Sequence, residues 1–228
     1  MTTKVYNCFK CLLLLLAAAT LPGAAWAQPS TISTTSTFSN NNGTGTVTFN
    51  LSNTNSYPVV ITEINGVTSS SGSVTVELYY NTTPVNGAPG AISAANGWTL
   101  SASATITGTA NPSTTTTQNF LTGDSLLIIP ANTTYGIAVF ATSQRYYNTG
   151  TAWSVATTYS AGGVSLVTGL NVGYAGGTPP TAPTNTPRGW IGSITFKPYS
   201  GIGANNIGVA KLVSPSNSCA GSYPISVQ

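Results

Sequence analysis

Hydrophobic and polar residues alternate along most of the chain after its first 27 residues. In residues 44–52, Val47, Phe49 and Leu51 alternate with threonine and asparagine. The same period of two recurs at residues 73–80, 98–106, 135–141 and 190–196. Side chains on one face of a β-strand repeat with this period, so we predict half-buried strands in these segments. The alternation also predicts the core-facing side chains: Val47, Phe49, Leu51, Val74, Val76, Leu78, Trp98, Leu100, Ile137, Val139, Ile194 and Phe196.

Turn-forming residues separate these segments. Clusters of Gly, Asn and Pro lie between the apolar runs, at residues 41–43, 65–66, 81–90 and 111–112. After residue 28 the chain has no segment with a convincing helical period. Many short strands divided by turns favour an all-β fold, an antiparallel β-sandwich of the immunoglobulin-like or jelly-roll type. A closed β-barrel is the alternative.

The first 27 residues have the layout of a cleavable signal peptide. Lys4 and Lys10 are followed by the apolar run 12–21, and the small-x-small motif at residues 25–27 precedes Gln28. The run is shorter than the roughly 20 residues that span a bilayer. We therefore expect a secreted or extracellular protein, free or associated with the cell surface, that starts at Gln28 and does not insert into membranes.

Charge is scarce in the chain that would remain after cleavage. Its basic residues are Arg145, Arg188, Lys197 and Lys211, and its acidic residues are Glu63, Glu77 and Asp124. A surface so close to neutral cannot supply the phosphate neutralisation that drives nucleic-acid binding. The 41% of hydrophobic residues and 9% of aromatic residues are nevertheless sufficient for a packed core. The composition therefore favours a globular domain that does not bind nucleic acid.

The residue types needed for most enzyme chemistry are missing. The chain has no histidine, which excludes a Ser-His-Asp triad and an imidazole relay. Glu77 alternates with Val76 and Leu78, so we expect it on a solvated strand face, and we expect Glu63 and Asp124 to be solvated as well. The sequence has no acid-rich loop of the kind that binds Ca²⁺. We predict a protein that is not an enzyme and that carries no cofactor or metal.

One polar stretch is rich in aromatic residues and is the best candidate for ligand binding. It contains Arg145, Tyr146, Tyr147, Asn148 and Trp153. Flat aromatic faces stack on sugar rings or proline-rich peptides, and Arg and Asn can add hydrogen bonds. The expected partner is a glycan or a surface protein. The alternative is that Trp153 and one of the tyrosines cover the open end of the sandwich.

The chain divides into four regions by composition. They are the signal peptide at 1–27, a β-sandwich domain at 28–199, a linker at 200–206 and the start of an incomplete second β module at 207–228. Within the domain, residues 174–187 form an unusually long Gly/Pro/Thr loop, which is either functional or a connector.

Two segments resemble known β-sandwich proteins. The segment LLIIPANTTYGIAVFAT (residues 126–142) resembles a passage of fibronectin-type and immunoglobulin-like domains, and the resemblance implies that Tyr135 is a tyrosine corner, bonded back to the main chain. The tail at residues 205–227 is similar to the opening of adhesion-related sandwich repeats in large secreted surface proteins of gliding-type bacteria.

The second resemblance implies a function. It implies a non-catalytic adhesive or structural module of a cell-surface protein, with further modules of the same polypeptide beyond Gln228. The alternative is a carbohydrate-binding module attached to an enzyme that is encoded further along.

Cys219 is the only cysteine that remains after cleavage. An odd cysteine in an exported protein suggests a missing partner, because lone thiols are unusual in oxidising compartments. We predict that Cys219 pairs with a cysteine beyond Gln228, so the isolated chain should form a disulfide-linked dimer on air oxidation. Non-reducing electrophoresis measures this, and an oxidised chain that stays monomeric would contradict the prediction.

Overall fold

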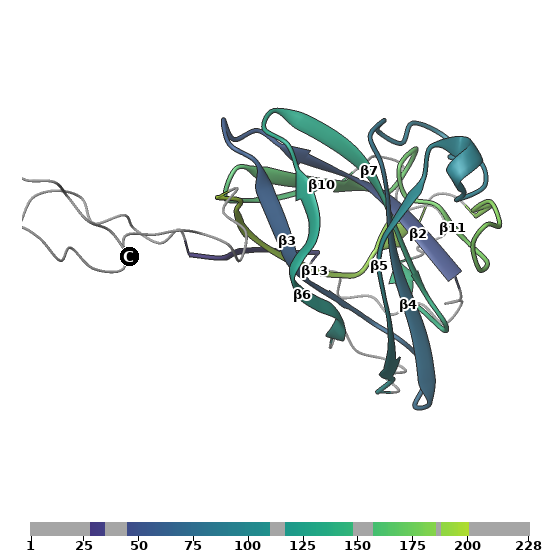
Figure 1. The fold of residues 1–228 in the computed structure, drawn as a ribbon. Coiled ribbons are helices and arrows are strands. Elements are labelled where there is room, and N and C mark those ends of the chain that lie inside the picture. The colour runs from purple at the N-terminus through teal and green to yellow at the C-terminus, as the bar shows by residue number, and fades with distance from the viewer. Residues whose placement is uncertain (1–27, 35–44, 110–116, 148–156, 186–187, 201–228) are drawn as a thin grey trace, which may run out of the picture. The chain divides into compact units, whose positions relative to one another are not determined.

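Two antiparallel β-sheets pack face to face around a hydrophobic core (Figure 1). The computed structural model describes residues 28–34, 45–109, 117–147, 157–185 and 188–200. Within this part of the chain each of the two sheets ends in two edge strands. The predicted antiparallel β-sandwich is therefore confirmed, and the alternative of a closed barrel is not observed.

The smaller of these sheets has four strands in the order β1-β13-β3-β6. Their bounds are β1 (Ser30–Ser33), β13 (Gly192–Pro198), β3 (Val59–Gly66) and β6 (Gln118–Ile129). The first and the last of the described strands, β1 and β13, thus lie side by side, with Ser30 opposite Phe196.

The larger sheet has the strand order β5-β4-β7-β2-β10-β9, and β11 also pairs with β2. Their bounds are β2 (Gly45–Asn53), β4 (Ser73–Asn81), β5 (Thr99–Thr107), β7 (Thr133–Ala141), β9 (Thr157–Ala161), β10 (Val164–Thr168) and β11 (Ala175–Gly176). A separate pair joins β8 (Tyr146–Tyr147) to β12 (Gly189–Trp190), and a 3-10 turn, η1, covers Ala94–Asn96.

The chain divides into two compact units, residues 1–198 and 199–228, and the sandwich belongs to the first. In the second unit only Tyr199 and Ser200 are described. The predicted linker, the predicted second module and Cys219 therefore lie outside the described residues.

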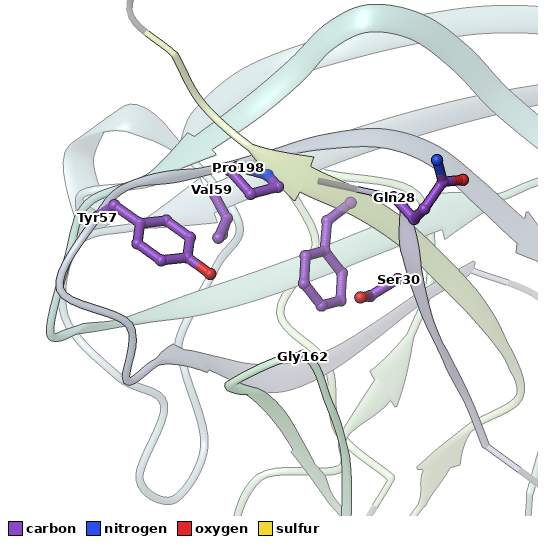
Figure 2. Close-up of a pocket in the computed structure, with 7 residues that line it drawn as sticks. Gln28, Ser30, Tyr57, Val59, Gly162 and Pro198 are labelled. Carbon is purple, nitrogen blue, oxygen red and sulfur yellow. The ribbon is translucent and has the colours of Figure 1, made fainter. Parts of the chain in front are cut away.

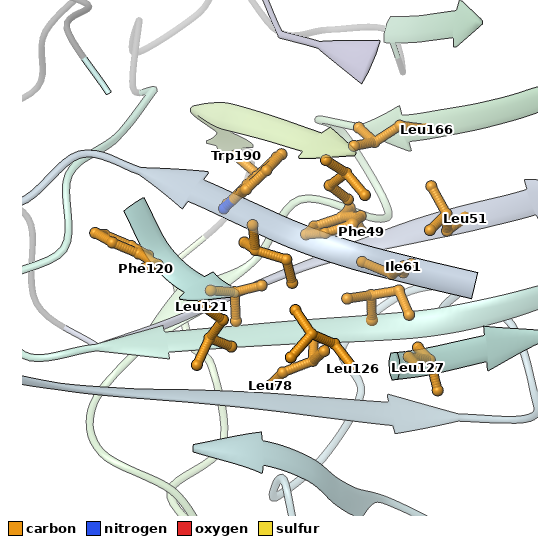
Figure 3. Close-up of a cluster of buried hydrophobic side chains, with 14 of the residues drawn as sticks. Phe49, Leu51, Ile61, Leu78, Phe120, Leu121, Leu126, Leu127, Leu166 and Trp190 are labelled. Atoms are coloured by element: carbon orange, nitrogen blue, oxygen red, sulfur yellow. The ribbon is translucent and has the colours of Figure 1, made fainter. Parts of the chain in front are cut away.

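Side chains from the inner faces of both sheets form the main core (Figure 3). Phe49 of β2 stacks on Trp190 of β12, with ring centroids 4.9 Å apart. The expected core residues of β2, β4, β7 and β13 all belong to this cluster. The period of two therefore predicted these strands and their inner faces correctly.

Strand β2 is buried on both faces, contrary to the expectation of a half-buried strand. Thr46 and Thr48 alternate with the core residues and are nevertheless fully buried. Their hydroxyls donate to the carbonyl oxygens of Gly177 and Val172. The start of the predicted long loop thus covers the outer face of β2. The loop lies so close to the strand that a Cβ on Gly45 would overlap the carbonyl oxygen of Gly176.

The connection between β4 and β5 covers the same outer face further along. The Asn50 side chain donates to the carbonyl oxygen of Val85 and accepts from its N–H, at 2.9 and 2.7 Å. This connection brings apolar side chains onto the outer face of the large sheet and forms a second, smaller core. The cluster consists of Val85, Ile92, Trp98, Ala138 and Tyr174, with Tyr79 packed against it.

A β-bulge in the pairing of β4 with β5 places two predicted core residues on the outer face. Leu78 lies opposite Ala102, but the next pair is Tyr79 with Leu100, so one residue of β5 is skipped. The skipped residue reverses the face on which the preceding side chains of β5 lie. Leu100 is 50% exposed, so its predicted place in the core is wrong. Trp98 is buried, at 3% exposure, but in the second core.

A buried asparagine at the end of β2 holds three connections of the sandwich together. The Asn53 amide nitrogen lies 2.9, 3.2 and 3.0 Å from the carbonyl oxygens of Tyr57, Ile129 and Pro130. Its oxygen accepts from the main-chain and side-chain nitrogens of Asn55. The Asn55 side chain in turn donates to a carbonyl oxygen of the β9–β10 turn. Asn53 therefore links the β2–β3 loop with the β6–β7 turn and, through Asn55, with the β9–β10 turn.

Replacing Asn53 with Ala should destabilise the domain strongly, because it leaves buried carbonyl groups without a donor. A buried group that loses its partner costs about 1–3 kcal/mol, so we expect a loss of about 3 kcal/mol. In a domain of this size that lowers the melting temperature by roughly 6–12 °C. Asn119→Ala, on the exposed side of edge strand β6, is the matched control and should change it little. Equal melting temperatures for the two variants would contradict this role of Asn53.

Candidate functional site

The predicted binding stretch begins among buried residues. Arg145 and Tyr146 are only 8% and 3% exposed, and Tyr146 belongs to the main core. The guanidinium of Arg188 lies 5.9 Å from the centre of the Tyr146 ring. Tyr146 thus packs into the sandwich, as the covering alternative describes for one of the tyrosines. The structure brings Arg145, Tyr146 and Tyr147 together at β8, where Tyr147 pairs with Gly189.

Two other residues of the predicted site, Asn148 and Trp153, lie outside the described residues. Ligand binding by them and by Tyr147 stays a prediction.

This stretch begins at one end of the sandwich. The N–H of Arg145 donates to the carbonyl oxygen of Val67, which directly follows the last residue of β3. Val59, the first residue of β3, lies at the other end of that strand. The seven steps of extended chain from Val59 to Gly66 separate the two ends of β3 by about 23 Å.

Tyr135 lies on β7, directly opposite Leu51 of β2. Its ring stacks on that of Tyr80, with centroids 5.6 Å apart and planes at 12°. Both rings pack against the main core. The described turn between β6 and β7 is held by Asn53, and the predicted bond from Tyr135 to the main chain stays a prediction.

A small pocket lies at the end of the sandwich where Val59 begins β3, opposite the end that holds Arg145. Figure 2 shows the residues that line this pocket. Its volume is about 170 Å³. Tyr57 is 43% exposed, one of the few large apolar side chains in the described residues with so much surface in solvent. The hydroxyls of Tyr57 and Ser30 point toward one another from opposite sides (Figure 2). The lining residues are Gln28, Ser30, Tyr57, Val59, Gly162, Phe196 and Pro198.

Strand register and one glycine position the wall of this pocket. Ser30 pairs with Phe196, which brings the start of the domain beside the end of β13. Gly162, in the β9–β10 turn, has a φ of 52°, a left-handed conformation that side chains rarely adopt. A Cβ there would lie 2.6 Å from the Ser30 hydroxyl oxygen. Sequence reasoning missed the pocket because its residues come from separate segments that carry no shared motif.

The size of the pocket suits a small ring. Ligand pockets for drug-sized molecules usually enclose roughly 300–1,000 Å³, so this one holds only a single ring or a short side chain. Its walls offer the apolar surface of Val59, Phe196 and Pro198, with hydroxyl groups at Tyr57 and Ser30. None of the seven lining residues is a carboxylate or a base.

The three carboxylates of the predicted mature chain lie elsewhere. Glu63 on β3 accepts a 2.6 Å hydrogen bond from the side chain of Asn65, and Asp124 lies exposed on β6. Glu77 belongs to the other sheet and accepts a hydrogen bond from the Tyr79 hydroxyl at 2.6 Å. Burial raises the pKa of the Tyr79 phenol, and the neighbouring Glu77 carboxylate raises it further. Each of the two glutamates thus has a structural partner.

The described residues lack two further kinds of site. They contain no cluster of three or more His, Cys, Asp or Glu that could hold a metal ion. They also contain no helix with the length and apolar character needed to cross a membrane. No protein-family model matches the chain, and no curated protein matches it in sequence. The function is therefore inferred from the fold and from the geometry of its two ends.

Alanine substitutions should separate a core tyrosine from an exposed one. Truncating a buried aromatic side chain costs about 3–5 kcal/mol, and we expect a loss of that size for Tyr146→Ala. Tyr57→Ala removes an exposed ring and should cost less than about 1 kcal/mol. Chemical denaturation of both variants measures the difference. A Tyr146→Ala protein as stable as the wild type would show that Tyr146 is not a core residue.

Proposed function

We propose that this chain is a non-catalytic extracellular β-sandwich module of a secreted or cell-surface protein, with an adhesive or structural role. The observation that carries the proposal is that the two ends of the domain differ. Gln28 and Pro198, near the two ends of the described domain, line the same pocket. The predicted binding stretch begins at Arg145, about one strand length away at the other end.

This difference between the two ends matches the geometry that a surface module needs. The described domain ends at Pro198, at the same end as the predicted N-terminus, so attachment through the residues that follow Pro198 would leave the opposite end to meet a partner. Arg145 and Tyr146 are buried, and Tyr146 belongs to the main core, so the first residues of the predicted stretch are part of the scaffold. Binding residues on connecting segments positioned by a rigid scaffold are a common arrangement.

Neutral hydrogen-bonding groups on the small sheet also favour this class of function. Thr31 and Thr195 share a hydrogen bond of 3.0 Å between their exposed hydroxyls on neighbouring strands. The same sheet carries two acids, Glu63 and Asp124, and one base, Lys197. A polar sheet without a cluster of basic residues suits an extracellular protein better than a nucleic-acid-binding one.

Protease treatment of intact cells tests the surface location. The full-length chain carries an epitope tag after Tyr199 in its native host, and a periplasmic protein serves as the control. We expect the tagged chain to be degraded on intact cells while the periplasmic control is spared. Protection of both proteins until the cells are lysed would overturn the surface assignment, and retention of residues 1–27 on the chain would overturn export.

The second candidate is a carbohydrate-binding module attached to an enzyme encoded further along the full-length protein. The exposed Tyr57 ring beside a pocket of about 170 Å³ favours it, because sugar rings stack on aromatic faces. A glycan array probed with the exported protein tests this candidate. Binding that is lost in Tyr57→Ala would locate the sugar at the pocket, whereas loss in Tyr147→Ala would locate it at the opposite end. An array without any signal would favour the adhesive or structural module.

A further inference from the structure

The residue that lines the pocket from the N-terminal side is also the predicted first residue of the exported protein. Residues 25–27 form the small-x-small motif of a signal peptidase site, and Gln28 follows directly. Export as proposed above therefore creates a free α-amine on Gln28. An N-terminal glutamine carries its own electrophile, because the side-chain amide carbon lies within reach of the α-amine in a five-membered ring.

The fold leaves this amine accessible and fixes where it lies. Gln28 and Pro29 are exposed, while Ser30 already pairs with Phe196 in the sheet. Only one residue therefore separates Gln28 from the anchored β1 strand. Gln28 lines the pocket together with Tyr57 and Pro198 (Figure 2). The new N-terminus is thus held at the rim of an apolar pocket and open to solvent or to a cyclising enzyme.

We infer that Gln28 is converted to an N-terminal pyroglutamyl residue in the exported protein. The α-amine nitrogen attacks the side-chain amide carbon, and a new C–N bond closes the lactam ring. The bond to the side-chain nitrogen breaks, and this nitrogen leaves as ammonia with a proton from the attacking amine. No oxidant or reductant takes part. The inference rests on the proposed export, since only cleavage before Gln28 frees the amine.

The modification changes the chemistry of the pocket rim. An α-amine with a pKa of about 7.7–8.0 is mostly charged at neutral pH, whereas the lactam is neutral. Cyclisation therefore replaces a cation beside Val59, Phe196 and Pro198 with an uncharged ring. It also removes the free amine that aminopeptidases require, which protects an exposed N-terminus outside the cell.

Mass spectrometry of the full-length protein, exported by its native host and measured without storage, tests this inference. We expect an intact mass lower by one ammonia than that of a chain starting with unmodified Gln28. The N-terminal peptide should not react with an amine-labelling reagent. The Gln28→Ala variant is the matched control: it should be cleaved at the same bond and should carry a reactive α-amine.

The possible failures are distinguishable. An unmodified Gln28 with a labelled amine would overturn the pyroglutamyl assignment and leave the proposed export intact. A chain that retains residues 1–27 would overturn export and the modification with it. A mass that corresponds to cleavage at another bond would overturn the modification alone, because Gln28 would then not be the first residue.

Discussion

The constraint on which the rest of the sandwich depends is the burial of β2 on both faces. Its inner side chains fill the main core, and its outer polar side chains, Thr46, Thr48 and Asn50, lie under covering segments. A buried hydroxyl or amide without a partner is costly, so each of these side chains needs a main-chain group of the covering segment at a defined position. The polar face of β2 therefore fixes where the β4–β5 connection and residues 172–177 lie.

Alternation along the sequence was sufficient for the fold class and for most of the core. It could not show that β2 is doubly buried, because threonine and asparagine suit a solvated strand face as well as a face satisfied by main-chain groups. The Gly, Asn and Pro clusters of residues 81–90 likewise predict only turns. Their apolar residue Val85 joins a second core, together with Ile92 and Trp98 of the same connection and with Ala138 and Tyr174 of distant segments. Such non-local packing leaves no periodic signal.

Strand β5 shows the second limit of period-two reasoning. Trp98, Leu100 and Ala102 alternate without interruption in the sequence, yet the bulge places the first two on the opposite face from Ala102. Because a skipped residue shifts every earlier side chain of its strand, one local irregularity changed two core predictions. Tertiary packing also determines the burial of Tyr146, which lies in a polar stretch of the sequence but belongs to the main core. The local sequence pattern therefore did not predict which side chains are buried, either in β5 or at Tyr146.

The pocket could not be predicted because strand register and two connections assemble it, without any local motif. Pairing of β1 with β13, and of β13 with β3, brings Ser30, Phe196 and Val59 to one end of the sandwich. That register also places the predicted cleavage site beside the last strand of the domain. The chemistry at Gln28 thus follows from sequence and fold together: the small-x-small motif defines which amine is freed, and the sheet defines what surrounds it. Cleavage at this bond leaves the domain complete, because the first residue of the sheet, Ser30, lies two positions further along.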